Sequence, residues 1–161
     1  MINELIEAPD LCVSVEDMKA YLRLVADTDD DLIEESISTA TQALERYLNR
    51  KIGSQTWKTS YEAVDKNSTV MLPFDPVISI DEVLGEEESE IEYTKILDLP
   101  IKLLIETDGA VYVTATYGYS TIPQLLLDGV KMCCAELYEK RHLADLGPIL
   151  KQFTRQRVVL L

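Results

Sequence analysis

The chain has 161 residues, 47% of them hydrophobic, so it can bury a core of its own without disulfides or a structural metal. Its net charge of −14 argues against a nucleic-acid-binding module, because an acidic surface repels phosphate. The first residues lack a basic segment followed by an apolar run, and no stretch approaches the roughly 18 apolar residues of a membrane span. We therefore expect neither a signal peptide nor a membrane segment.

The charge is unevenly distributed along the chain. Residues 1–130 hold 26 acids and 9 bases, a net of −17, whereas residues 131–161 hold 3 acids and 6 bases, a net of +3. The carboxyl-terminal part is thus the region that could favour an acidic partner surface. An equally simple interpretation is solubility combined with an ordinary basic terminus.

Residues 1–13 are expected to form a flexible leader before the first helix. Ser14 has the side chain of a helix N-cap, and two acids follow it, where carboxylates meet the positive end of the helix dipole. The helix is predicted over about residues 15–24. Its apolar face comprises Met18, Tyr21 and Leu22.

The acidic run from Asp27 to Asp31 resembles the beginning of a calcium-binding loop. Such a loop needs glycine at its sixth position and glutamate at its twelfth, and counting from Asp27 these positions hold Leu32 and Ser38. The acids fit better as the N-cap and first turn of a second helix, so we expect no metal here.

The second helix is predicted over about residues 31–49 as an element of the core. Its apolar side chains recur at steps of three and four residues and form one stripe, namely Ile33, Ile37, Ala40, Leu44, Tyr47 and Leu48. A stripe of this kind packs against other elements rather than facing solvent.

After Gly53 the pattern changes to the two-residue period of a half-buried strand, with Trp57, Thr59 and Tyr61 on one side. Short apolar runs between turn residues predict further strands near residues 70–73, 77–84, 91–94, 101–106 and 111–117. The acidic segment 85–89 and the Asp-Gly pair at 108–109 are predicted hairpin turns. Residues 54–117 should thus form a small, mostly antiparallel sheet of about five or six strands.

The last long helix is predicted over about residues 123–142, with Pro123 in its first turn, where the missing N–H costs nothing. Its buried face comprises Leu126, Val130, Cys133 or Cys134, Leu137 and Tyr138. A Gly-Pro pair at 147–148 ends the compact region and leaves a tail over residues 148–161. The predicted fold class is α+β: one domain, residues 14–147, of packed amphipathic helices with the β-sheet inserted between the second and the last long helix.

The sequence offers no set of residues for catalysis. Its single histidine, His142, lies at the predicted end of a helix, where a cation suits the dipole. The three cysteines, Cys12, Cys133 and Cys134, include an adjacent pair that points about 100° apart on a helix, so we expect buried thiols. Neither a nucleophile elbow nor a phosphate-binding glycine loop is present. We therefore expect a protein that is not an enzyme and uses no cofactor and no metal.

Three segments, in this order, resemble the head–tail connector (adaptor) proteins of long-tailed bacteriophages, in particular the HK97-type adaptors and their longer prophage relatives. The first is VEDMKAYLR at 15–23. The second is DDDLI at 29–33, continued by ALERYLNR at 43–50 and QTW at 55–57. The third combines YGY at 117–119, IP at 122–123 and ELYEKR at 136–141. The acidic hairpin at 85–89 departs from the family's pattern. The long tail also departs from it, and this difference bears on the contacts of the C-terminus.

The resemblance implies a structural virion protein. Members of this family form rings, usually of about twelve copies in the particle, beneath the portal protein. The ring extends the channel through which duplex DNA passes without sequence-specific binding, and its other face receives the tail or a tail-completion (stopper) protein. The implied location is the neck of the virion, after assembly in the host cytoplasm and without a membrane partner.

For this chain the resemblance points to candidate residues in two places. Candidate channel-facing acids are Asp29, Asp30, Asp31, Glu34 and Glu35. Their charge would let DNA slide past without the phosphate contacts that release counterions. The candidate portal-docking tail comprises Phe153, Arg155, Arg157, Val158, Val159, Leu160 and Leu161.

Two other functions are compatible with the same sequence. A tail-completion or stopper protein would share the compact acidic character and would bind later in assembly. An acidic cytosolic protein-binding module that mimics DNA would use carboxylates in place of phosphates and would stay monomeric or dimeric. Direct binding to portal-bearing heads would distinguish an adaptor from both.

Overall fold

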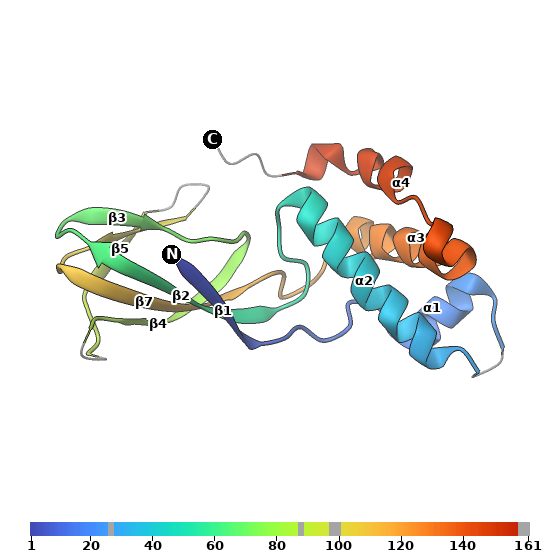
Figure 1. The fold of residues 1–161 in the computed structure, drawn as a ribbon, viewed down its shortest axis with the longest axis horizontal. Helices are drawn as coiled ribbons and strands as arrows, with labels where there is room; N and C mark the ends of the chain where they lie inside the picture. Colours follow the sequence, from blue (N-terminus) through green and yellow to red (C-terminus); the bar gives the residue numbers. More distant parts are fainter. Residues whose placement is uncertain (26–27, 87–88, 97–100, 158–161) are drawn as a thin grey trace. The chain divides into compact units, whose positions relative to one another are not determined.

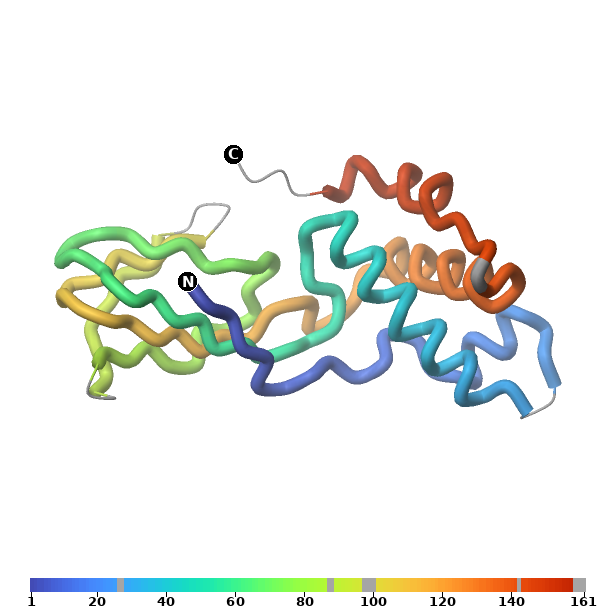
Figure 2. Tube along the Cα trace, in the orientation of Figure 1, coloured from blue at the N-terminus to red at the C-terminus, as the bar shows by residue number. Residues whose placement is uncertain are grey.

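A computed structural model describes residues 1–25, 28–86, 89–96 and 101–157, and these residues form two compact units. Of the described residues, the β unit comprises Met1–Pro9 and Ser54–Ser120, and the helical unit comprises Asp10–Gly53 and residues 121–157. The chain therefore begins in the β unit, enters the helical unit, returns to the β unit and then enters the helical unit a second time. Figure 2 traces this path: the blue start and the green-to-yellow middle of the chain are extended, whereas the light-blue and red parts are coiled.

The β unit contains two antiparallel sheets (Figure 1). The larger sheet has the order β1-β2-β7-β4, with strands β1 (Ile2–Glu7), β2 (Gln55–Val64), β7 (Gly109–Tyr117) and β4 (Val77–Leu84). The smaller sheet has the order β3-β6-β5, with strands β3 (Ser68–Met71), β6 (Lys102–Ile105) and β5 (Tyr93–Ile96).

The single sheet expected from the sequence is thus wrong, because the strands divide between two sheets. The chain changes sheet at several points, and one of them follows β4, where a hairpin is closed by hydrogen bonds from the Gly85 N–H to the Ser89 carbonyl (3.0 Å) and from the Ile91 N–H to the Val83 carbonyl (3.2 Å). Strand β5 then pairs with β6 instead of continuing along β4. Two facing sheets bury the apolar sides of both, which one open sheet could not do.

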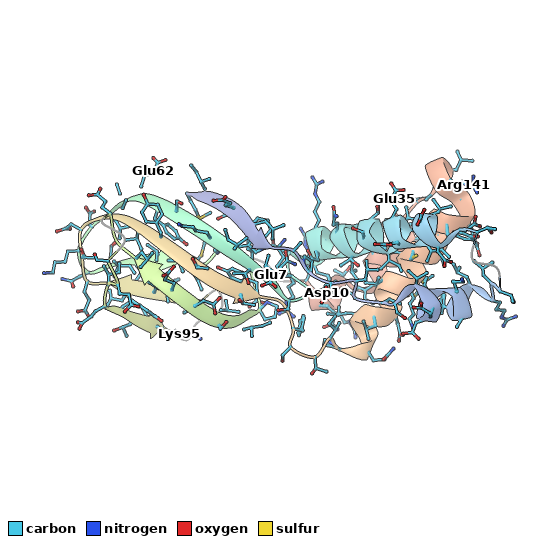
Figure 3. The ribbon with its side chains drawn as sticks, turned by 90° about the horizontal axis from the view of Figure 1, so that it is seen from below. Glu7, Asp10, Glu35, Glu62, Lys95 and Arg141 are labelled. Atoms are coloured by element: carbon cyan, nitrogen blue, oxygen red, sulfur yellow. The ribbon has the colours of Figure 1, made fainter. Side chains whose placement is uncertain are left out.

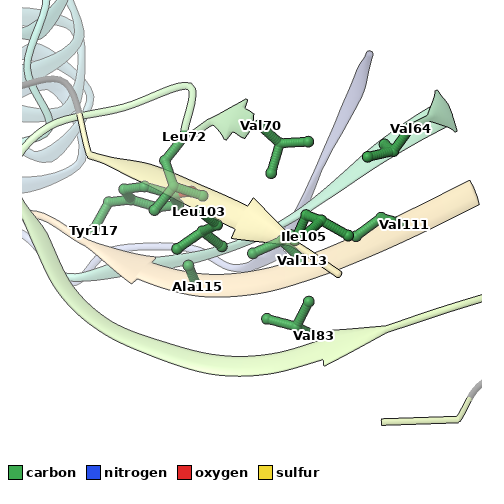
Figure 4. Close-up of a cluster of buried hydrophobic side chains, with 10 residues drawn as sticks. All are labelled: Val64, Val70, Leu72, Val83, Leu103, Ile105, Val111, Val113, Ala115 and Tyr117. Carbon is green, nitrogen blue, oxygen red and sulfur yellow. The ribbon is translucent and has the colours of Figure 1, made fainter. Parts of the chain in front are cut away.

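One core lies between the two sheets (Figure 4). Strand β7 alternates between core and surface, and Leu103 and Ile105 of β6 are also fully buried. The ring of Phe74 bridges two other aromatic rings, with centroids 4.9 Å from Trp57 and 5.3 Å from Tyr117. The buried cluster consists of Val64, Val70, Leu72, Val83, Leu103, Ile105, Val111, Val113, Ala115 and Tyr117.

The expected flexible leader is wrong for residues 2–7, which form β1 and pair with β2 from Ile2 opposite Ser60 to Glu7 opposite Thr56. The partner residues lie 49 to 58 positions away in the sequence. A six-residue segment without a regular alternation does not reveal such a partner, because strand pairing is a non-local property.

The helical unit is built from α1 (Val15–Leu22), α2 (Asp30–Leu48) and α3 (Gln124–Lys140), each within two residues of the helix predicted at its place. The predicted N-cap of α1 is confirmed, since the Ser14 Oγ accepts a 3.1 Å hydrogen bond from the Asp17 N–H. After α3 follow a 3-10 helix η1 (Arg141–Leu143), a short helix α4 (Gly147–Gln152) and a second 3-10 helix η2 (Thr154–Gln156).

The predicted stripe of α2 forms the centre of the helical core. Ile33, Ile37, Ala40, Leu44 and Leu48 are completely buried, whereas Tyr47 is half-buried. Helix α3 contributes Leu126, Gly129, Val130 and both Cys133 and Cys134. Tyr21 of α1, expected on a buried face, is 49% exposed, because this short helix turns only Met18 fully inward.

Candidate functional site

Two of the five predicted channel-facing acids are engaged within the helical unit. Asp29 is the N-cap residue of α2, but its Oδ2 accepts a 2.6 Å hydrogen bond from the Tyr138 hydroxyl of α3 instead of capping the helix. This hydrogen bond raises the pKa of Tyr138, because deprotonation would place two negative charges side by side. Asp30 pairs with Lys19 of α1 at 2.8 Å. Asp29 and Asp30 therefore connect the beginning of α2 to α3 and α1.

The other three acids, Asp31, Glu34 and Glu35, are exposed and lie within the first two turns of α2. Spacings of three and four residues bring them to neighbouring positions on the helix surface. They line an open groove of about 370 Å³, together with Leu11, Ser38 and Thr39. The structure thus keeps three of the five predicted acids together as a solvent-facing acidic surface.

Glu35 also borders a second groove of about 250 Å³ that runs between α2 and α3. This groove is lined by Leu32, Glu35, Ser36, Thr39, Leu137 and Arg141. Figure 3 shows the labelled side chains of Glu35 and Arg141 in the helical unit. Because Arg141 is exposed at the end of α3, the acidic surface has a basic residue on its border.

The predicted tail is not an appendage over residues 148–157, which belong to the helical unit. Phe153 is only 4% exposed, and a Cβ atom placed on Gly129 would lie 2.9 Å from its ring. The sequence predicts that the compact region ends at Gly147, whereas α4 begins there. The Gly-Pro pair starts this helix because proline at N1 or N2 lacks an N–H that the first turn would leave unpaired anyway.

Tyr47 of α2 provides the second anchor of this segment. Its hydroxyl lies 2.7 Å from Thr154 Oγ1, and the Arg157 guanidinium lies 5.7 Å from the centroid of its ring. The predicted docking residues thus separate into three groups. Phe153 is buried in the core, Arg155 and Arg157 are exposed, and residues 158–161 lie outside the described part of the chain.

The cysteines have the environment of buried apolar side chains. Burial raises the pKa of Cys133 to about 11 and that of Cys134 to about 12. It also raises the pKa of Cys12, against a hydrogen bond with Thr41. A thiol that holds its proton at neutral pH is a poor nucleophile and a poor metal ligand. The side chain of His142 is not among the side chains that the structure describes.

Neither a metal centre nor a membrane span is found among the residues that the structure describes. No three histidine, cysteine or carboxylate side chains of these residues come close enough together to hold a metal ion. None of their helices combines the length and the apolar character that a bilayer crossing requires.

Sequence reasoning missed the contacts that hold these surfaces in place. Tyr138 lies on the predicted buried face of α3, but its hydrogen bond to Asp29 joins residues 109 positions apart. Tyr47 lies on the predicted stripe of α2, but its partner Thr154 lies in the presumed tail. An apolar stripe predicts which side chains are buried but not which residues they contact.

Known proteins that are similar in sequence or fold identify the family of this chain. The chain matches the family model described as "Phage gp6-like head-tail connector protein" over residues 13–96. No curated protein is significantly similar to it.

Three solved structures have a similar fold. The chain aligns with one from "Neck of empty GTA particle computed with C6 symmetry", with a TM-score of 0.80, 21% identity and coverage of 100% of this chain and 97% of that one. A chain from "Virion of native gene transfer agent (GTA) particle" aligns with a TM-score of 0.77 and 20% identity, and the alignment covers 100% of this chain and 97% of that one. A chain from "Neck of native GTA particle computed with C12 symmetry" aligns with a TM-score of 0.71 and 20% identity, and the alignment covers 98% of this chain and 97% of that one.

At these identities the solved structures establish the fold and not the function. The family model covers more than half of the chain, and it includes α1, α2 and the strands from β2 to β5. The resemblance noted from the sequence segments agrees with it. The chain therefore belongs to the phage gp6-like head-tail connector family, and its role is that of a structural connector.

Proposed function

We propose that copies of this chain form a closed ring in the neck of a phage-like particle, beneath the portal protein, where the ring joins head to tail and catalyses no reaction. The single observation that carries this proposal is the family match over residues 13–96. Similar chains from necks computed with C6 and C12 symmetry support a ring of about twelve copies. Assembly would take place in the host cytoplasm, without a membrane partner.

The ring would extend the channel for duplex DNA. Twelve copies carry a formal charge of 12 × −14 = −168, although salt screens charges more than about 10 Å apart. Only acids near the channel wall therefore act on DNA, and Asp31, Glu34 and Glu35 are the candidates because they are exposed. An acidic wall makes no contacts with the phosphates, so no counterions are released from the DNA and the DNA would slide without being held.

The two faces of the ring would meet different partners. On the head side, the exposed bases Arg155 and Arg157 would dock on the portal together with the terminal residues 158–161. Phe153 takes no part in this docking, because its side chain is buried in its own chain. The other face would receive a tail-completion or stopper protein.

Co-assembly with portal-bearing heads tests this proposal. Purified chain is mixed with heads that carry the portal and no other connector protein, and the heads are sedimented and imaged by electron microscopy. We expect the chain to sediment with the heads as a ring at the portal vertex, and not with heads that lack the portal. A chain that stays in the supernatant, or that needs a second connector before it binds, would refute the adaptor role.

A further inference from the structure

Strand β1 is an edge strand that the β unit leaves uncovered. All six of its residues are exposed, and they include apolar side chains with large exposed fractions: 61% for Ile2, 44% for Leu5 and 55% for Ile6. β1 pairs with β2 on one side only, so the backbone groups of its other side face solvent. Native proteins usually protect such an edge with lysine, proline or an irregularity. β1 contains neither lysine nor proline, and its one register shift lies at its end, between Leu5 and Glu7.

The other three edge strands are more interrupted or shorter than β1. β4 has two register shifts. β3 has four residues, and its Met71 carbonyl already accepts a 2.6 Å hydrogen bond from the Tyr61 hydroxyl. β5 also has four residues. Among the described strands, β1 is therefore the longest edge with no more than one register shift.

We propose that β1 of one copy pairs edge to edge with β5 of the neighbouring copy in the ring. This inference rests on the proposed ring and names the contact that closes it. Main-chain hydrogen bonds between the two edges would hold the strands together, and their side chains would set the choice of partner.

Among the edge strands, only β5 carries a charge opposite to that of β1. β1 carries Glu4 and Glu7 and no base, β4 carries two acids, β3 carries no charge, and β5 carries Lys95 and no acid. Glu4 lies opposite Lys58 in its own sheet, whereas Glu7 lies opposite Thr56, so the charge of Glu7 has no basic residue across from it. Opposite charges on paired strands stabilise the pair, and like charges destabilise it.

The apolar side chains of the two edges also fit one another. Tyr93 of β5 is 38% exposed and can pack against Leu5 or Ile6 of a neighbour. Pairs between aromatic and aliphatic side chains are among the favourable cross-strand pairs.

The positions of the two strands suit a ring. β3 lies on the side of β1, because Met1 and the residues of β3 line one groove of about 310 Å³. β5 is at the opposite edge of its sheet, whose order is β3-β6-β5. In the view of Figure 3, β1 runs along the upper side of the β unit and Lys95 lies at its lower side. β1 and β5 of one copy are therefore unlike faces, each free for a different neighbour, and contacts of this kind generate closed rings.

A lysine on the exposed edge tests the pairing. Ile6→Lys should leave the monomer folded, because the side chain is 55% exposed, but should reduce the number of copies bound per portal-bearing head at least about tenfold. Ile78→Lys on β4, where the side chain is 40% exposed, is the matched control and should bind like the wild type. Equal loss in both variants, or no loss in either, would overturn the β1–β5 contact. Failure of the wild type to bind would instead count against the ring itself.

A charge exchange tests the choice of β5. Glu7→Lys and Lys95→Glu should each lower the copy number per head several-fold, because like charges then meet across the contact. A chain with both substitutions restores the opposite charges with their signs exchanged and should recover most of the wild-type occupancy. Circular dichroism melting of each variant checks that it is folded. A double variant that binds no better than the single variants would exclude β5 as the partner strand.

Discussion

Gly129 sets the distance between three elements of the helical unit. A Cβ atom at this position would lie 2.9 Å from Phe153 Cζ and 3.0 Å from Leu44 Cδ2. Glycine inside a helix costs about 1 kcal/mol relative to alanine, and close packing of α2, α3 and Phe153 accounts for its presence here.

We expect Gly129→Ala to lower the free energy of unfolding by about 1–3 kcal/mol, because overpacking outweighs the gain in helix propensity. Urea denaturation measures this change. In a Phe153→Ala background the ring is absent, so the same substitution should cost less, although the close contact with Leu44 remains. An equal cost in both backgrounds would contradict the contact.

Ala40 lies at the centre of the α2 stripe and is completely buried. Ala40→Asp would place a carboxylate where nothing can solvate it, so we expect a loss of several kcal/mol and failure to fold at ordinary temperature. Thr39→Asp, one residue along and exposed, is the control. Thermal melting monitored by circular dichroism distinguishes them, and an unchanged melting curve for Ala40→Asp would refute the core assignment.

Tyr61 makes the stability of the β unit depend on pH. Burial raises the pKa of its hydroxyl from 10.0 to about 12. The unfolded chain therefore loses the proton first. The stabilisation is complete below pH 10 and is lost as the pH rises through about 12.

Tyr61→Phe removes the hydrogen bond to the Met71 carbonyl and should lower the free energy of unfolding at neutral pH by about 1 kcal/mol. Its stability should also fall less steeply between pH 10 and 12 than that of the wild type. Part of the slope should remain, because burial raises the pKa of Tyr117 as well. Tyr21→Phe, at a residue 49% exposed, is the control, and denaturant titrations across this pH range supply the measurement.

At the scale of elements, the C-terminal segment consists of an integral part and a terminal part. α4 and Phe153 pack in the helical unit, and Thr154 and Arg157 contact Tyr47. The sequence predicts one tail over residues 148–161, because a Gly-Pro pair marks a break equally well at the end of one helix or at the beginning of another.

Two truncations separate these parts. A chain that ends after Arg157 should unfold with the free energy of the full chain but bind portal-bearing heads weakly. A chain that ends after Gln152 loses Phe153 and should be destabilised by about 3–5 kcal/mol, the usual cost of removing a buried phenylalanine side chain. Unimpaired binding by the first chain would rule out docking through the terminal residues.

At the scale of the whole molecule, the negative charge is concentrated in one unit. Met1–Pro9 and Ser54–Ser120 hold 15 acids and 4 bases, a net of −11, which leaves 14 acids and 11 bases, a net of −3, for the rest. The β unit thus carries most of the net negative charge. The helical unit combines an acidic surface on α2 with exposed bases near its C-terminus.

The proposed channel surface can be tested by charge reversal. Replacing Asp31, Glu34 and Glu35 together by lysine should make assembled rings retain duplex DNA, with binding that weakens as salt increases, because phosphate contacts now release counterions. Reversal of three exposed acids of the β unit, Glu62, Glu82 and Glu92, changes the net charge equally and serves as the control. Fluorescence anisotropy with labelled duplex measures retention, and equal retention by both variants would place the channel wall elsewhere.

The sequence by itself determined the order and type of most elements, because the periods of 3.6 and 2 residues are local properties of the chain. Those periods predict α1, α2, α3 and the strands from β2 to β7, and the order of three segments indicates the connector family. The pairing of β1 with β2, the division into two sheets and the inclusion of Phe153 in a core were decided by the tertiary structure alone. Each of these joins residues far apart in sequence, and such pairings are chosen by the apolar area that the whole chain buries, which no local pattern records.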